Sequence, residues 1–286
     1  MAPSETNATV WNDQLLKHPH EAADKRQRVQ RMFAAIAPSY DLNNRLHSLW
    51  MDQRWRRKAV KLAAVEPTDL IFDVACGTGD LTFAFYSELI LKRLHRDRKI
   101  SSPPLGQVFG LDFTYEMLPL AWAKAARPSF GMHLGALEQV QDLAWARQSR
   151  ISWLNGDALS LPLPDQSADV LSIAFGIRNV SDPAAAIREF HRVLRPGGRL
   201  IILEFSLPTN AVMRGLYNFY FRKILPRTAT LISGDKTGAY KYLPESVNTF
   251  INRETMMEMM KTAGFGEVTQ HPMTFGVCVC YRGVKL

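Results

Sequence analysis

A short apolar strand that runs into a glycine-rich turn constrains this chain more than any other feature. Residues 70–74 (LIFDV) lead into Gly77-Thr78-Gly79 and then into a helix expected from Asp80 to about Leu94. Glycine reaches the positive φ angles of a tight turn and lets the backbone approach a ligand closely. The first turn of the following helix presents N–H groups that have no partner within the helix. The pattern predicts one βα unit of a parallel sheet, with a ligand held at its turn.

Strand and helix patterns alternate along the rest of the chain. Short apolar runs separated by helical stretches are typical of a parallel sheet with helices on both faces. The last two runs are joined by a short connection, so they should form an antiparallel hairpin at the sheet edge. We therefore expect an α/β fold with a doubly wound, mostly parallel, seven-stranded sheet. The expected strands are 70–74, 108–112, 151–154, 168–174, 199–205, 265–270 and 274–281, with helices at 117–126 and 183–194.

The length of the chain suits one large domain. It has 286 residues, of which 47% are hydrophobic, enough for a full core. Residues 1–22 are polar and are expected to be disordered, so the domain should span 23–286. A helical N-terminal cap is expected over 25–62, and the segments near 95–106 and 128–149 are interpreted as insertions.

The balance of charges is basic, with a formal net charge of +8. A basic surface favours anionic partners, including nucleic acid, acidic lipid and a charged cofactor, without choosing among them. The basic runs at 54–58 and 92–96 are more typical of solvated helix faces than of a binding patch.

The cysteines and the hydropathy pattern exclude several classes of protein. The three cysteines form no disulfide framework and have no metal-ligand spacing, so we expect no metal and a reducing compartment. Cys278 and Cys280 should point to the same side of one strand. No apolar run reaches the roughly 18 residues of a membrane span, and residues 1–21 lack a signal core, so we expect a cytoplasmic protein.

Three acidic side chains follow three of the expected strands. Asp73 closes the first strand, Asp112 closes the second, and Asp157 comes just after the third. Asp73 alone could be a capping residue and Asp157 part of an ordinary turn, but the carboxyl ends of neighbouring parallel strands share one crevice. Asp112 can accept ribose hydroxyls there, and Asp157 could bind the edge of a base. These residues predict a nucleoside ligand.

The glycine turn departs from the dinucleotide pattern. The third glycine of Gly-x-Gly-x-x-Gly is replaced by Thr82, which disfavours an NAD-dependent enzyme. An acidic residue at Asp73 beside the turn suits an amino-acid-like tail better than a phosphate. We therefore expect S-adenosylmethionine to bind Asp73, Gly77 and Gly79.

Arg178 and Asn179 follow the fourth strand and should reach the same crevice, on the side that faces the second substrate. An arginine there can hold an anionic oxygen or orient a water molecule. The alternative interpretation of Arg178 is a structural salt bridge.

Three runs together resemble the quinone-biosynthesis C-methyltransferases, the family shared by demethylmenaquinone methyltransferase and 2-methoxy-6-polyprenyl-benzoquinol methylase. They are VACGTGD at 74–80, FGIRNV at 175–180 and RVLRPGG at 192–198, and APSYDLN at 37–43 resembles the family's entry motif. The resemblance extends from about Val29 to Leu286. It implies the class I, Rossmann-like methyltransferase fold, with S-adenosylmethionine as methyl donor.

The resemblance also implies site residues and a reaction. By position, the cofactor contacts fall on Thr78, Asp112, Asp157 and Ala158, whereas a cofactor serine of the family is Ala174 here. The implied reaction is C-methylation of a polyprenylated hydroquinone, whose ring carbon attacks the sulfonium methyl. Such a displacement requires a deprotonated ring hydroxyl, in-line geometry and a dry site.

On this interpretation Tyr40, Asp41 and Arg178 surround the ring hydroxyl, and Arg178 stabilises the phenolate. Tyr40 is equally compatible with a place in the core. The runs 110–113, 217–221 and 274–277 resemble the menaquinone members more closely, so demethylmenaquinol is the expected substrate. The methoxy-benzoquinol of ubiquinone biosynthesis is the alternative.

The isoprenoid tail of such a substrate needs an apolar groove or a membrane. Residues 216–225 are aromatic and basic together, so they could lie peripherally on the inner face of the plasma membrane or form a buried lid helix. A nucleic-acid methyltransferase is disfavoured because no typical catalytic run or RNA-binding module is seen. A non-catalytic binding subunit is disfavoured by the intact glycine turn. The sequence leaves open whether the protein forms a homodimer.

Overall fold

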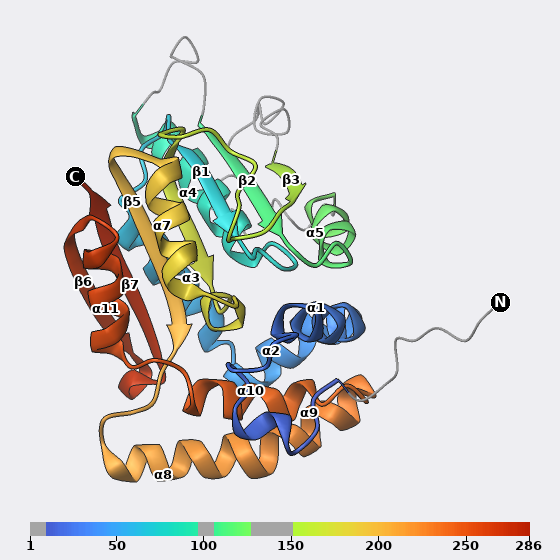
Figure 1. Ribbon diagram of the computed structural model, residues 1–286. Coiled ribbons are helices and arrows are strands. Elements are labelled where there is room, and N and C mark those ends of the chain that lie inside the picture. Colours follow the sequence, from blue (N-terminus) through green and yellow to red (C-terminus); the bar gives the residue numbers. More distant parts are fainter. Residues whose placement is uncertain (1–9, 97–105, 127–150) are drawn as a thin grey trace.

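A seven-stranded sheet forms the centre of the computed structural model, which describes residues 10–96, 106–126 and 151–286 (Figure 1). The strand order is β3-β2-β1-β4-β5-β7-β6. The first five strands in this order are parallel, and β7 is antiparallel to both of its neighbours. The predicted doubly wound sheet with an antiparallel C-terminal hairpin is confirmed. The strands are β1 (Leu70–Val74), β2 (Gln107–Asp112), β3 (Ile151–Asn155), β4 (Ala168–Ala174), β5 (Leu194–Phe205), β6 (Phe265–Met273) and β7 (Cys278–Lys285).

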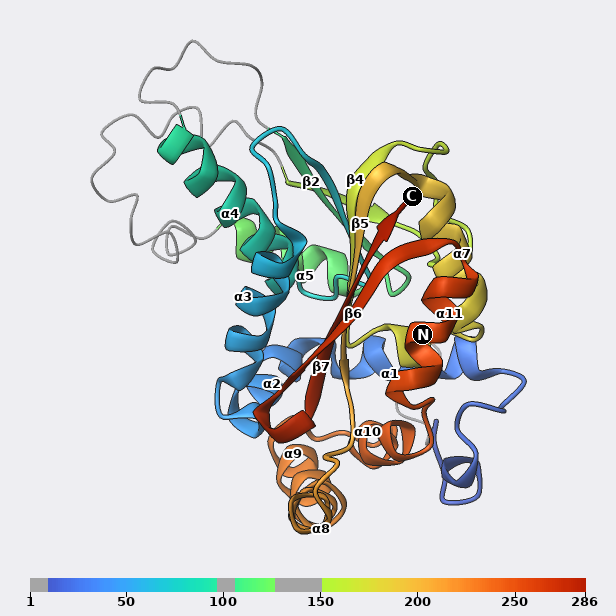
Figure 2. The same cartoon turned by 90° about the vertical axis from the view of Figure 1, so that its left-hand side faces the viewer.

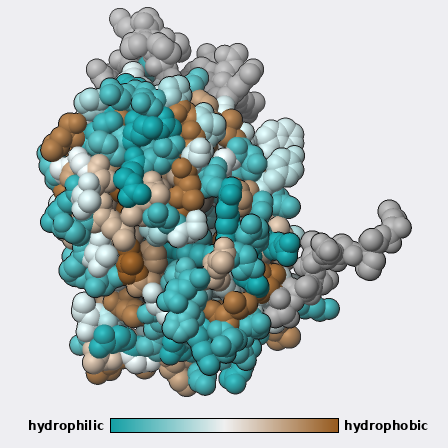
Figure 3. Space-filling model, viewed as in Figure 1, coloured by the Kyte–Doolittle hydropathy of each residue, from teal (hydrophilic) through white to brown (hydrophobic). Residues whose placement is uncertain are grey.

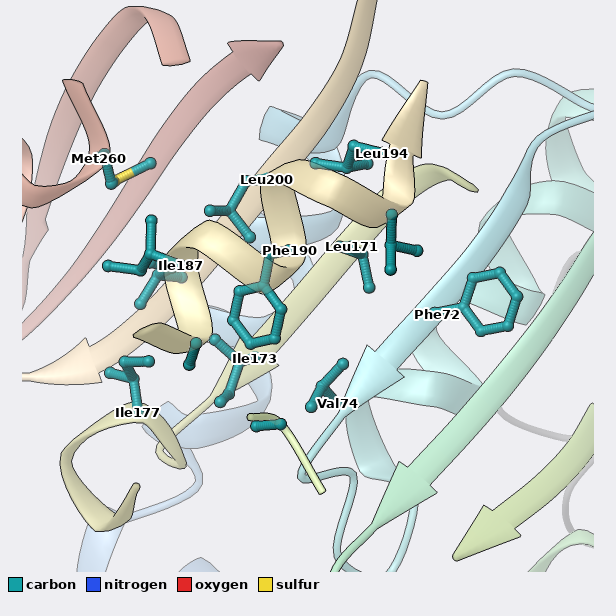
Figure 4. Close-up of a cluster of buried hydrophobic side chains, with 14 of the residues drawn as sticks. Phe72, Val74, Leu171, Ile173, Ile177, Ile187, Phe190, Leu194, Leu200 and Met260 are labelled. Carbon is teal, nitrogen blue, oxygen red and sulfur yellow. The ribbon is translucent and has the colours of Figure 1, made fainter. Parts of the chain in front are cut away.

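Helices cover both faces of the sheet, as Figure 2 shows. On one face α3 and α4 bury side chains such as Trp55 and Phe85 in a core that also holds Cys278 and Cys280, which therefore point the same way as predicted. On the other face α7 and α11 pack Ile187, Phe190 and Met260 over the strands (Figure 4). The helices of these layers are α3 (Met51–Ala63), α4 (Asp80–Arg96), α5 (Met117–Ala125), α7 (Pro183–Val193) and α11 (Arg253–Thr262).

A third layer of helices lies beyond the carboxyl ends of the parallel strands, at the bottom of both Figure 1 and Figure 2. It combines two segments that are far apart in the sequence and that share a small core of their own, which includes Met32, Ile36, Leu225 and Tyr242. Its N-terminal half was expected, and a lid helix at 216–225 was one of two interpretations of that segment, but the packing of the two segments together was not predicted. Its helices are α1 (Lys25–Ile36), α2 (Tyr40–Ser48), α8 (Ala211–Phe219), α9 (Leu225–Ser233) and α10 (Ala239–Asn248), with a π-helical turn at Tyr220–Ile224 between α8 and α9.

The N-terminal segment departs from expectation. The prediction of a disordered segment is wrong for residues 10–22, whereas residues 1–9 lie outside the described part of the chain. Trp11 is buried and stacks on Tyr242 of α10 with 4.5 Å between ring centroids. The backbone N–H groups of Val10 and Trp11 both donate to the carbonyl oxygen of Thr237. Leu16 is buried in the same core. The sequence did not indicate this packing because the few apolar residues of the segment are separated by polar ones.

Element ends differ in two places. Strand β5 begins at Leu194 instead of residue 199, because Leu194 pairs with Ala168 before a register shift. Strand β7 begins only at Cys278, since Thr274–Gly276 form a short helical turn after β6. The expected insertions at 95–106 and 128–149 lie almost wholly outside the described residues.

Candidate active site

The crevice of this fold opens where β1 and β4 lie side by side, because the chain leaves β1 toward β2 and returns through β4. Ligands of open α/β sheets bind at this point, beyond the carboxyl ends of the strands. The glycine turn follows β1 and therefore lies in the crevice. Gly77 and Gly79 have φ angles of +56° and +86°, which glycine adopts without strain.

The two glycines of the turn have different surroundings. A Cβ on Gly79 would come within 2.5 Å of the Trp153 ring, so this position needs a small residue for packing. A Cβ on Gly77 would meet only the Tyr40 ring at 3.9 Å, so the backbone there borders open space. Gly77 is the part of the turn that a ligand can approach.

Asp112 holds the turn from the neighbouring strand. Its carboxylate accepts the N–H of Gly77 and the N–H of Thr114, each at 2.7 Å. Burial raises its pKa to about 6, against the opposing effect of these hydrogen bonds. The side chain lines a cavity of about 100 Å³ together with Gly77, Asp157 and Ala158. Four of the predicted cofactor residues thus surround one space, which fits a nucleoside with its ribose at Asp112.

Asp73 lies beneath the turn and is almost fully buried. Its two carboxylate oxygens accept hydroxyl protons from Thr82 and Ser172, each at 2.7 Å. Burial raises its pKa to about 6. Thr82 therefore satisfies a buried carboxylate at the position where a dinucleotide fold has glycine. Asp73 borders a small recess behind the turn rather than the larger nucleoside cavity.

Asp157 reaches the same cavity but already has a partner. Arg26 of α1 pairs with its carboxylate at 2.6 Å, and the guanidinium of Arg26 also lies 4.5 Å above the Phe113 ring. The N-terminal helix therefore closes the nucleoside cavity from outside. This contact joins segments more than a hundred residues apart, and no sequence pattern indicated it.

Asp41, which was predicted to lie beside the ring hydroxyl, makes its contacts at the glycine turn. Its carboxylate accepts the Thr78 hydroxyl at 2.5 Å and pairs with Lys124 at 2.6 Å. Lys124 also pairs with Asp80 at 2.7 Å, and the charges around Asp80 lower its pKa to about 2. Asp41, Thr78 and Lys124 form a polar cluster that braces the glycine turn. Lys124 was missed because nothing in its helix distinguishes it from a surface lysine.

A second, larger cavity of about 380 Å³ adjoins the first. Its lining is mostly apolar and comes from the helical layer, from the first half of α3, from Phe205 of β5 and from the segments after β4 and β6. Phe33, Tyr40 and Phe175 line both cavities and so form the wall between them. Tyr40, which the sequence left between a site and a core role, lies at this junction, where burial raises its pKa.

Arg178 lines the larger cavity and also forms a salt bridge, which was the alternative interpretation of this residue. Its Nη1 donates to Glu204 at 2.6 Å and to the carbonyl oxygen of Phe175 at 2.8 Å. Both charged side chains are buried. Asn179 faces the smaller cavity, where its side-chain oxygen accepts the Tyr242 hydroxyl at 3.0 Å.

The pKa of Asp112 predicts how cofactor binding depends on pH. The pKa of Asp112 in the folded protein is about 6, above its ordinary value, so ionising the carboxylate costs stability as pH rises from about 4 to 6. Ligand hydroxyls that donate to the ionised carboxylate offset this cost, so the ligand binds the ionised form. The affinity for S-adenosylmethionine should be constant above about pH 7 and fall about tenfold per unit below pH 6. Calorimetric titration from pH 5 to 8 measures this, and Asp112→Asn should flatten the profile.

Known proteins are similar to this chain over most of its length. Residues 21–285 match the ubiE/COQ5 methyltransferase family. A Deinococcus radiodurans protein named demethylmenaquinone methyltransferase is 40% identical over 262 residues, which cover 92% of this chain and 94% of that protein. A Thermus thermophilus protein of the same name is 42% identical over 252 residues (88% and 99%). A Geobacter sp. M21 protein named ubiquinone/menaquinone biosynthesis C-methyltransferase is 38% identical over 263 residues (92% and 98%).

Solved structures share the fold. A SAM-dependent methyltransferase of Thermotoga maritima aligns with a TM-score of 0.53 and 20% identity, covering 90% of this chain and 100% of that one. A methyltransferase of Haloferax volcanii, solved with its Trm112 activator, gives 0.53 and 18% (88% and 96%). At these identities the likeness concerns the fold alone. The family match and the curated relatives show that this chain is an S-adenosylmethionine-dependent methyltransferase and belongs to the ubiE/COQ5 methyltransferase family.

Proposed function

We propose that this protein methylates a ring carbon of a polyprenylated hydroquinone, and that demethylmenaquinol is its substrate. The observation that carries the proposal is the apolar cavity of about 380 Å³ that shares a wall with the nucleoside cavity. A methyl group must pass directly between two substrates, so the second substrate has to fill a space that adjoins the first. The names of the relatives from Deinococcus and Thermus support the naphthoquinol ring.

The cavity suits the chemistry of such a ring. S-adenosylmethionine supplies an electrophilic methyl group that needs no metal. Two buried guanidiniums line the cavity: that of Arg56 lies over the Phe175 ring, and that of Arg178 lies over the Phe205 ring. Positive charge in a poorly solvated site favours the phenolate over the phenol. The hydrogen bonds of Arg178 to other described residues use Nε and Nη1, which leaves Nη2 as a donor for a substrate oxygen.

The purified protein tests this proposal directly. With S-adenosylmethionine under anaerobic conditions, it should convert demethylmenaquinol to menaquinol and leave a prenylated methoxy-benzoquinol largely unchanged. Mass spectrometry of the extracted quinones gives the readout. Preference for the benzoquinol would support the ubiquinone alternative, and methylation of RNA or DNA without quinol turnover would contradict the proposal.

We further propose that α8, the π turn and α9 rest on a membrane surface. The stretch 206–234 contains four cationic residues and no acidic residue. Its helices expose several apolar side chains, whereas Tyr217 and Leu225 are buried. Each helix therefore has one side that could face lipid and one side that packs on the protein. Along the lower edge of Figure 3 apolar side chains alternate with hydrophilic ones where α8 lies. The exposed apolar residues are Val212, Leu216, Phe219, Ile224, Leu231 and Ile232.

Peripheral binding fits this surface, because no helix within the described ranges is long and apolar enough to cross a bilayer. Each cation near an anionic membrane contributes about 1 kcal/mol. The triple variant Arg222→Gln, Lys223→Gln and Arg227→Gln should therefore bind anionic liposomes about 100-fold more weakly in a sedimentation assay. Arg282→Gln, on the distant β7, is the matched control. Liposome binding that is unchanged in the triple variant, with a dimer in gel filtration, would assign this face to a second copy of the chain.

A further inference from the structure

A base for the ring hydroxyl can be identified among the titratable side chains of the larger cavity. Most of them are unsuitable. Arg56 and Arg178 are held protonated by their carboxylate partners. Burial raises the pKa of all four tyrosines, which keeps them neutral and non-basic. The titratable groups that line the cavity, from the described elements packed around it, are Tyr40, His47, Asp52, Arg56, Arg178, Tyr220, Tyr240 and Tyr242.

The carboxylate of Asp52 is also unsuitable as a base, because other side chains already donate to both of its oxygens. One of its carboxylate oxygens accepts the Ser48 hydroxyl at 2.9 Å, and the other accepts Arg56 at 2.7 Å and the Gln53 amide at 3.1 Å. Its ion pair with Arg56 is buried, and a buried cation that loses its partner is strongly destabilising, so Asp52 is held in this pair. His47 therefore remains as the group that can accept a proton.

The contacts of His47 orient its imidazole. Its Nδ1 lies 3.1 Å from the hydroxyl oxygen of Tyr220, and that hydroxyl also lies 3.4 Å from the carbonyl oxygen of His47. A hydroxyl has one proton and a carbonyl can only accept, so both contacts are hydrogen bonds only when Tyr220 donates to the carbonyl and accepts from Nδ1–H. We take this tautomer as part of the proposal below. The lone pair is then on Nε2, which is buried and has no hydrogen-bond partner among the described residues. Burial lowers the pKa of His47, so the imidazole is neutral at pH 7.

We propose that Nε2 of His47 accepts the proton of the quinol hydroxyl during methyl transfer, an inference that rests on the proposed function. The ring carbon forms a bond to the methyl carbon as the C–S bond breaks and its electron pair stays on sulfur. The hydroxyl proton moves to Nε2. The methylated ring then loses its own C–H proton to solvent, and the imidazolium returns a proton to the oxygen, so one proton is released overall.

The rate of methylation against pH tests this assignment. At saturating concentrations of both substrates, the wild-type kcat should be constant above pH 7 and fall about tenfold per unit below the pKa of the imidazole. His47→Gln should lower kcat at pH 7.5 by about 100-fold or more, within the range of general-base catalysis, and should lose this acid limb. Its affinity for S-adenosylmethionine should not change. His271→Gln, on the outer strand β6, is the matched control.

A second readout does not depend on turnover. In NMR spectra of the histidine rings, an unreactive naphthol should displace the His47 resonance and shift its titration, whereas Tyr220→Phe should shift the titration without naphthol. If His47→Gln does not fold, the wild-type kcat profile and the NMR titration still test whether His47 is the base. A flat kcat from pH 5 to 8, or a His47 signal that naphthol leaves unmoved, overturns the proposal. Wild-type protein that methylates no quinol overturns the proposed function instead.

Discussion

Replacing Asp112 with alanine is expected to weaken S-adenosylmethionine binding by about 100- to 1000-fold. In the proposed complex the carboxylate accepts the ribose hydroxyls, and hydrogen bonds to a charged group contribute about 1.5–3 kcal/mol each. Two such bonds give about 3–4 kcal/mol as a lower estimate, and each 1.4 kcal/mol is a tenfold change in Kd. The variant also leaves the N–H groups of Gly77 and Thr114 without their acceptor, so the turn itself loses its support.

Isothermal titration calorimetry measures this effect, with thermal unfolding as the check on folding. Glu116→Gln is the control, because the Glu116 carboxylate is exposed and lies only four residues after Asp112, just before α5. Asp112→Asn separates two contributions, since the amide oxygen can accept one backbone N–H but carries no charge. A Kd for Asp112→Ala within threefold of wild type would show that the ribose binds elsewhere.

Breaking the buried pair of Arg178 and Glu204 is expected to destabilise the protein by about 3–5 kcal/mol. Removing one partner leaves an uncompensated charge in the interior, which costs far more than the pair itself contributes. Both side chains are buried and lie 2.6 Å apart. Arg178→Met and Glu204→Gln should each lower the midpoint of urea unfolding. Arg282→Met, which removes the exposed partner of Glu267, should cost about 1 kcal/mol or less.

The double variant Arg178→Met with Glu204→Gln distinguishes a structural role from a catalytic one. It contains no unpaired buried charge, so it should recover much of the lost stability. If Arg178 also stabilises the phenolate, kcat should stay at least 100-fold low in the double variant while S-adenosylmethionine binds normally. Recovery of kcat together with stability would assign Arg178 to structure alone. A simple Arg178→Ala comparison could not separate these outcomes.

Several features of the fold could be predicted because they depend on local chemistry. The apolar run at β1 and the glycines at 77 and 79 forecast the βα turn, since only a few backbone conformations suit such a sequence. The hairpin of β6 and β7 followed from their short connection. The placement of Asp112 beside Gly77 followed from the rule that parallel strands end at one edge.

Other features depend on contacts between distant segments. Asp41 and Tyr40 were both placed at the ring hydroxyl on the family resemblance, but successive helical residues point in different directions. Tyr40 reaches the wall between the cavities, while Asp41 turns to Thr78 and Lys124. His47 and Tyr220 approach each other from helical segments more than 170 residues apart, and no sequence pattern linked the two residues.

The glycine turn, the acidic residues that follow the strands and the mostly parallel sheet with its antiparallel hairpin were predicted from the sequence alone, because turn chemistry and hydrophobic period act over a few residues. The order of the strands came from the tertiary structure. The tertiary structure decided which charges neutralise one another, as with Arg26 and Asp157 or Arg178 and Glu204. It also decided that the segment at 211–248 completes the helical layer started by α1 and α2, and so encloses the apolar cavity. Burial and pairing are properties of the packed chain, since they depend on which distant surfaces exclude water together.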